Sequence, residues 1–522
     1  MLTPPSLTSR QWWLPMLLAL VTVAGCSSVN PPGTRPGHDL DRQMFTAGYE
    51  DIDQFYVQKP DLQNMTISGL SALSEIDHRF SVKAEVGKLD LVYDSNIAET
   101  FIAGGDLAPD DWAELTTNAL AAARKLSPTL GKADTEAIYK TVFGGMVGRL
   151  DRFSRYAGRD EAAEERAMLE GFGGLGIDIT IEDRVVRIVS VERHTPAERV
   201  GLRADDVIAA IDGTETKSLD DQAVINMLRG PVGSSVTLTI QRPGIAEPLK
   251  IVARRAHMVP ESVTYRREGD VAYIHVYEFN ESTADSVHGQ VEKARSDIGS
   301  QMQGIVLDLR DDPGGFLDQA VAVANLFMTS VPIVSTRGRN PDSNQHFEAS
   351  HGDIAKGQPI AVLINADSAS AAEIVAAALQ DSGRAVIIGS NSYGNGTVQT
   401  VLDMPNGGEI VLTWARFFAP SGYTLNHLGV LPTICTDNKD GDATAIIADL
   451  AAGRLKAVPV TQRDSTSHDD TAALDRLRAQ CPAFHGTHAV DLEVALRLLA
   501  QPLLYATAVT LAEPNTKTLE PQ

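Results

Sequence analysis

Four short, largely apolar runs between residues 271 and 390 restrict the possible folds more than any other feature of the sequence. They read "VAYIHVYEF", "GIVLDLR", "IAVLIN" and "AVIIGS", and helical segments such as "FLDQAVAVANLFM" and "SAAEIVAAALQD" lie between them. A strand that is apolar on both faces must be covered on both faces, which is typical of parallel strands joined by helices. The sequence therefore predicts an α/β core that contains parallel strand pairs.

A different pattern precedes this core, over residues 171–256. Strand-like runs such as "GIDITIEDRVVRIVSV", "ADDVIAAI", "SSVTLTIQR" and "LKIVARR" are interrupted by a short helical segment, "TPAERVGL", and a longer one, "SLDDQAVINMLRG". Short strands at this spacing predict a small, partly open barrel. The order of its elements resembles that of a bacterial PDZ domain.

The remaining parts of the chain contain no motif that suggests a catalytic or binding role. Residues 38–165 show helical periodicity, as in "DLDRQMFTAGYEDIDQFYV", and we expect a helical N-terminal region there. The core is expected over residues 257–435, followed by a linker and helical tail over 436–522 that ends in "DLEVALRLLAQPLL". A chain of 522 residues is consistent with about three units of ordinary domain size.

The first residues predict export. Residues 1–26 hold one basic residue, Arg10, then an apolar stretch and the segment "VAGC", which resembles a bacterial lipobox ending at Cys26. We therefore expect a lipidated cysteine, a Pro/Gly-rich linker over residues 27–37, and a lipoprotein facing the periplasm, with outer-membrane sorting slightly favoured by Ser27 and Ser28. A cysteine buried in a signal-anchor helix is the alternative.

Charge and cysteine usage restrict the partners. The formal net charge of −23, with no basic run, argues against nucleic-acid binding. In an oxidising compartment Cys435 and Cys481 predict a disulfide that stabilises the fold by ~3–4 kcal/mol. A zinc site formed by Cys481, His485 and His488 lacks a convincing fourth ligand. No cofactor is expected, because the Gly-rich segments lack the phosphate-binding patterns.

The run "FGGLG" is a candidate peptide-binding loop. Glycines leading into a strand usually form only a bend, but they can also present several backbone N–H groups to one carboxylate. Placed in a PDZ-like strand order, such a loop binds the C-terminus of a peptide that is added as an extra strand. The residues concerned are Phe172, Gly173, Gly174, Leu175 and Gly176.

Two segments of the core could carry a reaction. In "GIVLDLRDDPGGFLDQA" the two glycines allow backbone N–H groups to converge at a helix start, which suits a developing oxyanion but also a tight β-to-α connection. In "SASAAEIVAAALQD", Ser370 and Glu373 form a capping box. A serine at a helix start also has the exposed hydroxyl of a nucleophile.

Taken together, "MVGRLDRFSRY", "GFGGLGIDI", "GIVLDLRDDPGG", "SASAAEIVAAALQDSGRAVIIGS", "SYGNGTVQ" and "LTWARFFAPSGYTL" resemble the C-terminal processing peptidases, which are tail-specific serine proteases with a PDZ domain. The resemblance covers about residues 140–435 in the expected order. It implies a crotonase-like (ClpP/crotonase) core with an inserted PDZ domain, and substrates that are proteins with exposed C-termini.

The resemblance also assigns roles to single residues. Ser370 falls on the nucleophile, Gly314 and the backbone of Ala371 on the oxyanion hole, and Gln399 on the glutamine that orients the base. Arg229, in "LRGPVG", resembles the PDZ residue that couples peptide binding to catalytic alignment.

One position departs from the family pattern. Asn395 stands where the family has the lysine that serves as general base, and an amide cannot accept the serine proton. Taken alone, its Asn-Gly pair predicts a hairpin turn. Glu373, Asp381 and His427 are the groups considered as substitutes. Two hypotheses follow: a lipid-anchored periplasmic serine endopeptidase, or a catalytically impaired relative that binds peptides as an adaptor or regulator. Homo-oligomer formation is open in both.

Overall fold

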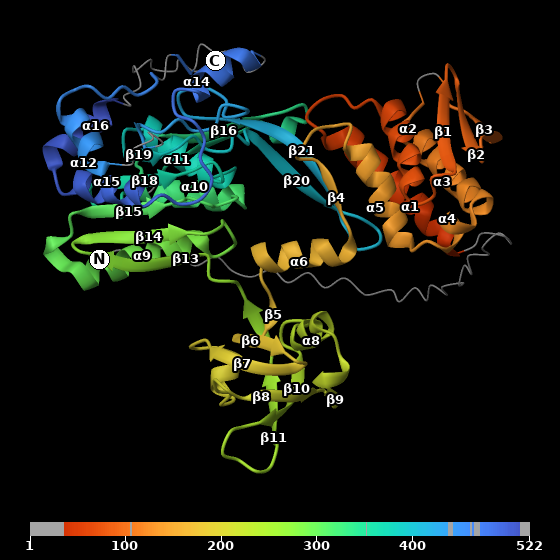
Figure 1. Ribbon diagram of the computed structural model, residues 1–522, viewed down its shortest axis with the longest axis horizontal. Helices are drawn as coiled ribbons and strands as arrows, with labels where there is room; N and C mark the ends of the chain where they lie inside the picture. The colour runs from red at the N-terminus through yellow and green to blue at the C-terminus, as the bar shows by residue number, and fades with distance from the viewer. Residues whose placement is uncertain are drawn as a thin grey trace, which may run out of the picture.

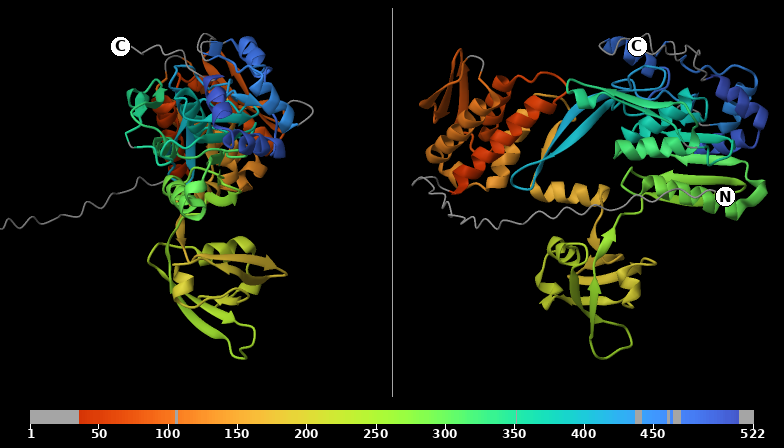
Figure 2. Two further views of the ribbon diagram at one scale, coloured as in Figure 1. Left: turned by 90° about the vertical axis from the view of Figure 1, so that its left-hand side faces the viewer. Right: turned by 180° about the vertical axis from the view of Figure 1, so that it is seen from behind.

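The computed structural model describes residues 36–104, 107–350, 352–436, 442–459, 462–463 and 470–511. The predicted signal, Cys26 and nearly all of the predicted linker lie outside these residues. Figure 1 shows an elongated body with an N-terminal lobe at one end and an α/β core at the other, and a small β-rich domain hanging below it. The two further views in Figure 2 show that this small domain is joined to the body by only a narrow connection.

The N-terminal lobe contains both helices and strands. Its elements are α1 (Pro36–Phe55), α2 (Leu62–Ala72), β1 (Phe80–Glu85), β2 (Lys88–Tyr93), β3 (Asn96–Ile102), α3 (Pro109–Leu126), α4 (Pro128–Lys132) and α5 (Thr135–Val147). The prediction of a helical region was therefore incomplete, because β1, β2 and β3 form an antiparallel sheet. The turns "EVGK" and "DSN" reverse the chain, with Gly87, Asp94 and Ser95 at positive φ. The helix α1 also begins at Pro36, inside the predicted linker.

The small domain has the predicted strand and helix order. Its elements are β5 (Phe172–Gly174), β6 (Ile177–Glu182), β7 (Val185–Val191), α7 (Pro196–Arg199), β8 (Val207–Ile211), β9 (Thr214–Glu215), α8 (Asp221–Leu228), β10 (Ser235–Gln241), β11 (Leu249–Arg254) and β12 (Ala256–Met258). The sheet order is β11-β10-β8-β7-β6, with β9 paired to β8. Strands β5 and β12 pair with each other and connect the domain to the body.

The α/β core is built on a six-stranded sheet in the order β13-β14-β15-β18-β19-β22. Its strands are β13 (Val263–Glu268), β14 (Val271–Val276), β15 (Gly304–Asp308), β18 (Ile360–Ile364), β19 (Val386–Gly389) and β22 (Ile434–Cys435). The four strands predicted from apolar runs are β14, β15, β18 and β19, and they pair in parallel. Only the edge strand β13 is antiparallel.

Both faces of this sheet are covered, which explains the continuous apolar runs. Helices α9 (Thr283–Ile298), α10 (Leu317–Phe327) and α11 (Ala371–Asp381) pack on one face. The other face is covered by α12 (Ala443–Ala451), α15 (Ala489–Leu499) and α16 (Pro502–Leu511). Side chains alternate accordingly: Ile305 and Leu307 face the first layer, and Val306 faces the second.

The C-terminal segment is therefore a layer of the core and not an appended tail, which corrects the prediction. Arg310 links the C-terminal segment to the sheet. Its guanidinium donates hydrogen bonds to Asp308 of β15 and, at 3.0 Å, to Asp491 of α15. The predicted last helix is in fact two helices, because Pro502 begins a new one. Between α12 and α15 lies α14 (Thr471–Arg478).

A second sheet joins the core to the N-terminal lobe and was missed from the sequence. It has the order β17-β16-β21-β20, with β4 paired to β21. Its members are β4 (Arg155–Ala157), β16 (Pro332–Arg337), β17 (Gln345–Glu348), β20 (Thr397–Asp403) and β21 (Glu409–Phe418), and α6 (Arg159–Leu169) follows β4. Met404, Ile410 and Leu412 of this hairpin are buried in the core of the N-terminal lobe. The strand that follows Asn395 is thus anchored at its far end in another lobe.

None of the described helices alone has the length and apolar composition needed to cross a membrane. The pair α15 and α16 would meet those criteria together but is bent by 116° between the two helices.

Candidate active site and peptide groove

Ser370 is the residue directly before α11, and its backbone has a conformation that serine rarely adopts. Its φ is 51° and its ψ is −111°, so the chain turns sharply between β18 and the helix. The helix that follows is wholly buried, from Ala371 to Asp381. A strained residue held at the start of a rigid helix is typical of functional sites, where the surrounding structure fixes one side chain in place.

The turn after β15 lies directly against Ser370. A Cβ atom added to Gly314 would lie 2.7 Å from Ser370 Cβ and 2.9 Å from the amide nitrogen of Ala371. Gly315 is equally confined, since its Cβ would lie 2.3 Å from the carbonyl oxygen of Phe279. The structure thus brings Gly314 against Ser370 and Ala371, although Gly314 is far from these two residues in the sequence. Only glycine permits this approach.

The amide of Gly314 is not free in this conformation. It donates a hydrogen bond of 2.8 Å to Oδ1 of Asp312, a buried carboxylate whose other oxygen has no partner among the described residues. Burial raises the pKa of Asp312 well above its ordinary value. An amide that already donates to a carboxylate cannot also bind an oxyanion, so Asp312 must turn away before Gly314 can serve that purpose. Its role was not predicted from the sequence.

Glu373 fixes the loop that carries Asn395. Its carboxylate is fully buried and accepts hydrogen bonds from the amides of Ser370, Gly394 and Asn395 and from the hydroxyl of Ser392. Burial raises its pKa, and these donors act in the opposite direction. Both oxygens are used, so Glu373 holds the Asn395 loop against Ser370 and does not act as a spare base.

Asn395 is bonded within its own loop and strand. Its Oδ1 accepts hydrogen bonds from the amide of Thr397 at 3.3 Å and from its hydroxyl at 2.8 Å. Nε2 of Gln399 in turn donates to Oγ1 of Thr397 at 2.7 Å. Gln399 therefore reaches position 395 only through Thr397, a residue that the motifs did not single out.

The Asn-Gly pair does not form the hairpin turn that the local sequence predicts. The strands on either side, β19 and β20, belong to different sheets. Gly394 has the positive φ of 86°, whereas Asn395 and Gly396 do not have positive φ. A Cβ on Gly396 would lie 1.9 Å from the amide nitrogen of Asn426, so this glycine is needed for close packing of two loops.

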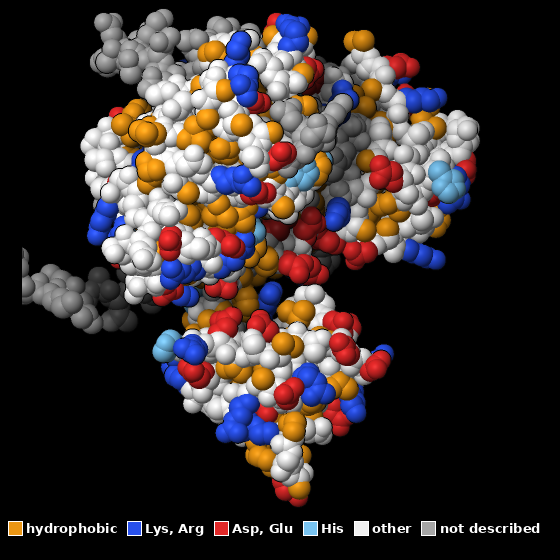
Figure 3. Space-filling model, turned by 60° about the vertical axis from the view of Figure 1, so that its left-hand side comes forward, with side chains coloured by type: hydrophobic (Ala, Val, Ile, Leu, Met, Phe, Trp, Pro, Cys, Tyr) orange, Lys and Arg blue, Asp and Glu red, His pale blue; other side chains and the backbone are white. Residues whose placement is uncertain are grey.

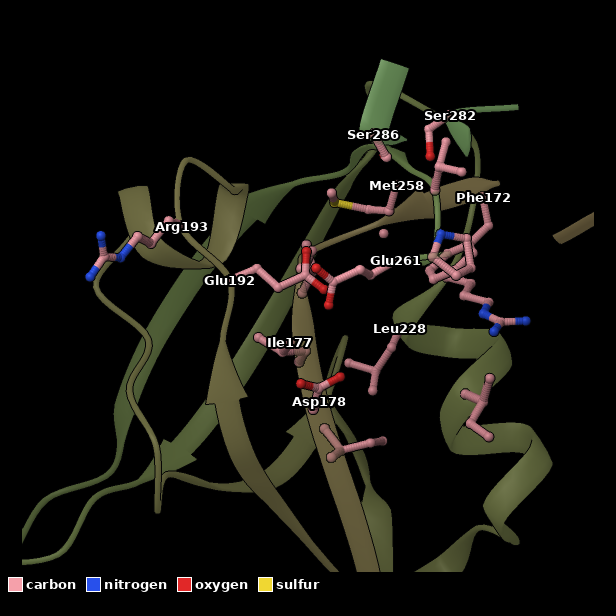
Figure 4. Close-up of a pocket in the computed structure, with 18 residues that line it drawn as sticks. Phe172, Ile177, Asp178, Glu192, Arg193, Leu228, Met258, Glu261, Ser282 and Ser286 are labelled. Carbon is pink, nitrogen blue, oxygen red and sulfur yellow. The ribbon is translucent and has the colours of Figure 1, made fainter. Parts of the chain in front are cut away.

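A groove in the small domain lies between β6 and α8. It encloses a pocket of about 820 Å³, within the range of ligand-binding sites. Ile177, Ile179, Ile225 and Leu228 provide apolar lining, and Phe172, Gly174, Leu175 and Gly176 of "FGGLG" line one end. Figure 4 shows side chains from both elements projecting into this space. The predicted peptide-binding loop therefore borders a groove of suitable size.

Other residues of the predicted loop have structural positions. Gly173 lines no part of the pocket but accepts a hydrogen bond from the amide of Gly230 at 3.0 Å, and its Cβ would lie 1.9 Å from the carbonyl of that residue. Arg229 follows α8, borders the groove and stacks over the ring of Phe172 at 4.1 Å. Arg229 thus connects the end of α8 to β5, the strand that leads to the body.

Comparison with known proteins identifies both parts. The family model described as "Peptidase family S41" matches residues 270–436, and a model described as "PDZ domain" matches residues 187–242. A "Carboxy-terminal-processing protease" from Bartonella bacilliformis is 40% identical over 306 residues, which are 58% of this chain and 70% of that protein. This chain belongs to the carboxy-terminal-processing protease family. A "Probable CtpA-like serine protease" from Staphylococcus aureus is 31% identical over 310 residues, 59% of this chain and 61% of that protein.

Among solved structures, a photosystem II D1 C-terminal processing protease is 24% identical to this chain, and the match covers 75% of this chain and 92% of that one. The TM-score is 0.38.

The lysine that is nearest to Ser370 in sequence is Lys356, which lies too far away to serve as its general base. Lys356 precedes β18, whereas Ser370 follows the opposite end of that strand, and five residues of strand span roughly 16 Å. Asp381 lies at the far end of α11, where Ser421 donates two hydrogen bonds to it. Neither residue reaches the nucleophile.

His427 lies next to the Asn395 loop through its backbone, which donates to the carbonyl of Gly394 at 3.1 Å. Burial, followed by Arg152, Arg416 and Arg478, lowers the pKa of His427, so the imidazole is neutral over a wider pH range. No hydrogen bond joins the ring of His427 to Ser370 among the described residues, so its use as a substitute base stays a prediction.

The two remaining cysteines of the chain are bonded to each other. The Sγ atoms of Cys435 and Cys481 are 2.05 Å apart, and the bridge joins β22 to the segment after α14. Cys481 is therefore not available as a zinc ligand. Of the two histidines of that alternative, His485 bonds Asp367 and His488 packs on Phe484.

Proposed function

We propose that this chain is an exported serine endopeptidase that binds protein C-termini in its PDZ groove and cleaves the bound protein with Ser370, slowly because position 395 holds asparagine. One observation carries the proposal. Ser370 stands in a strained conformation at the start of a buried helix, with the turn of Gly314 and the amide of Ala371 packed against it. This arrangement suits attack on a carbonyl, and it can stabilise the resulting oxyanion once Asp312 releases the amide of Gly314.

Membership of the carboxy-terminal-processing protease family supports the reaction class, and the groove between β6 and α8 supports the substrate class. The core would then be of the crotonase-like type that the sequence motifs imply. Loss of a general base from such a site leaves oxyanion and binding effects, a residual ~10³–10⁴-fold acceleration over water. Slow turnover of a tightly held substrate is the expected behaviour.

We further propose that the mature protein is attached to a membrane by lipid on Cys26, faces the periplasm, and is sorted to the outer membrane. The proposal rests on the apolar stretch, the "VAGC" segment and the serines that follow. Metabolic labelling with a palmitate analogue tests it. Label should be incorporated in the wild type and be absent from Cys26→Ser, and equal labelling of both contradicts lipidation at this position.

A second function is favoured by the state of the base position. The Oδ1 atom of Asn395 is occupied by Thr397, and both oxygens of Glu373 are occupied, so neither group can accept the serine proton. The protein would then be a peptide-binding adaptor or regulator without turnover.

One experiment separates the two functions. The detergent-solubilised full chain and its Ser370→Ala variant are incubated with an unstructured protein that ends in an apolar residue, and binding and cleavage are measured on the same samples. The peptidase is supported if the wild type cleaves and Ser370→Ala only binds. Binding without cleavage by either protein supports the adaptor. Cleavage by both proteins at equal rates excludes Ser370 as the nucleophile.

A further inference from the structure

The peptide groove has an edge strand on one side and an unusual charge at one end. Strand β6 ends the sheet order, so one of its edges has no partner strand among the described residues and faces α8. An extended peptide can pair with such an edge. Its last residue would lie at the "FGGLG" loop. This step rests on the proposed function.

Side-chain direction along β6 separates two parts of the groove. Ile177 and Ile179 pack against the core of the small domain, whereas Asp178, between them, points to the opposite face and is exposed. A peptide paired with β6 alternates in the same way. If its last side chain enters the apolar part beside Ile177 and Leu228, its penultimate side chain projects to the face of Asp178.

That face carries three carboxylates, from three different segments. Asp178 comes from β6, Glu192 follows β7, and Glu261 lies in the segment that returns to the body. The amide of Glu192 donates to the carbonyl of Gly176 at 3.1 Å, which places it beside the loop expected to hold the peptide terminus. In Figure 4 the carboxylates of Glu192 and Glu261 lie in the middle of the pocket, with Asp178 below them.

The basic residues of the groove do not compensate these charges. Arg193 points away from the pocket in Figure 4, and Arg229 is stacked over Phe172. The three carboxylates line one pocket, and burial, followed by repulsion from Asp178 and Glu261, raises the pKa of Glu192. Figure 3 shows further acidic side chains on both sides of the narrow connection next to the groove. A peptide with a free carboxylate would be repelled unless it brings its own positive charge.

We propose that the groove selects C-termini with an apolar last residue and a lysine or arginine at the penultimate position. The apolar part of the groove binds the last side chain. The carboxylates of Asp178, Glu192 and Glu261 pair with the cation next to it and offset their repulsion of the terminal carboxylate. The substrates of this protein are therefore proteins with basic tails of this kind.

The test uses fluorescein-labelled peptides that are identical except for Lys, Gln or Glu before a final Val. They are titrated with the full chain carrying Ser370→Ala, which binds without cleavage, and anisotropy gives each Kd. We expect the Lys peptide to bind at least tenfold more tightly than the Glu peptide at 50 mM NaCl, with a smaller ratio at 500 mM.

Two further variants locate the effect. Combined Asp178→Asn, Glu192→Gln and Glu261→Gln should bring the Kd values for the Lys and Glu peptides within twofold of each other. Combined Asp205→Asn, Glu215→Gln and Glu247→Gln removes the same charge from exposed positions of the same domain that do not line the groove and should preserve the preference. Equal Kd values for the Lys and Glu peptides on the unaltered groove overturn the inference alone. If no peptide binds, the proposed capture of C-termini fails as well.

Discussion

The peptide groove and the Ser370 site differ in how their polar groups are used. In the groove, the outer edge of β6 has no partner strand among the described residues, and a pocket of about 820 Å³ lies beside it. At Ser370 the amide of Gly314, the proposed oxyanion donor, is hydrogen-bonded to Asp312, and the amide oxygen of Asn395 accepts from Thr397. The difference teaches that the proposed peptide capture can proceed in this conformation, whereas the proposed reaction needs both a movement of Asp312 and a proton acceptor.

The comparison can be sharpened by destabilising the core without altering the groove. Replacing both cysteines, Cys435→Ser with Cys481→Ser, should lower the free energy of unfolding of the core by ~3–4 kcal/mol, because the unfolded chain loses a cross-link between residues 46 apart. Denaturant titration measures this, and peptide Kd at 25 °C should stay within twofold. Wild-type protein treated with a reductant is the control. Unchanged unfolding midpoints would show that the bridge does not stabilise the core.

Blocking the groove should weaken peptide binding and leave the Ser370 site unchanged. Ile225→Arg places a charged side chain in the apolar lining and should weaken peptide binding at least ~10-fold, as expected for loss of one buried aliphatic contact. The matched control is Asn226→Arg, on the next, exposed residue of α8, which lies outside this pocket. Labelling of Ser370 by a small fluorophosphonate should be the same in both variants. Equal Kd values for the two variants would place the peptide elsewhere.

A smaller effect concerns Asp312 and pH. A carboxyl group whose pKa is raised in the folded state keeps its proton longer there than in the unfolded chain. Its contribution to stability is therefore complete at low pH and is lost as the pH rises through the folded-state pKa. Asp312→Asn should raise Tm by about 2–4 °C at pH 8 and change it little at pH 4, as expected for roughly 1 kcal/mol. A gain of equal size at both values would rule out titration of Asp312 as the cause.

Much of the fold follows from the sequence, because strands covered on both faces leave a continuous apolar signature. Val306 and Leu307 face different helical layers, and both must be apolar. The sheet of the N-terminal lobe was not predicted, because the helical periodicity of residues 38–165 was taken to hold for the whole region. Val82 and Leu91 instead pair across β1 and β2. The hairpin of β20 and β21 was missed because its partner lobe is remote in sequence.

The candidate site likewise contains residues that the sequence could predict and residues that it could not. Ser370, Gly314 and Ala371 could be named from motifs and meet in the structure. Asp312 and Thr397 could not be named in this way. The hydrogen bond from the Gly314 amide to Asp312, and the position of the Thr397 hydroxyl between the side chains of Asn395 and Gln399, leave no pattern in the sequence.

The rate of cleavage at saturating peptide, measured in single turnovers on wild type, Asn395→Lys and Asn395→Met, tests the central claim most directly. Lysine restores a proton acceptor at position 395, and methionine supplies a similar shape without one. The account predicts that Asn395→Lys cleaves ~10²–10⁴-fold faster than wild type, as a general base contributes, while Asn395→Met gains nothing and peptide Kd is unchanged in both. Wild type that cleaves as fast as Asn395→Lys would contradict it.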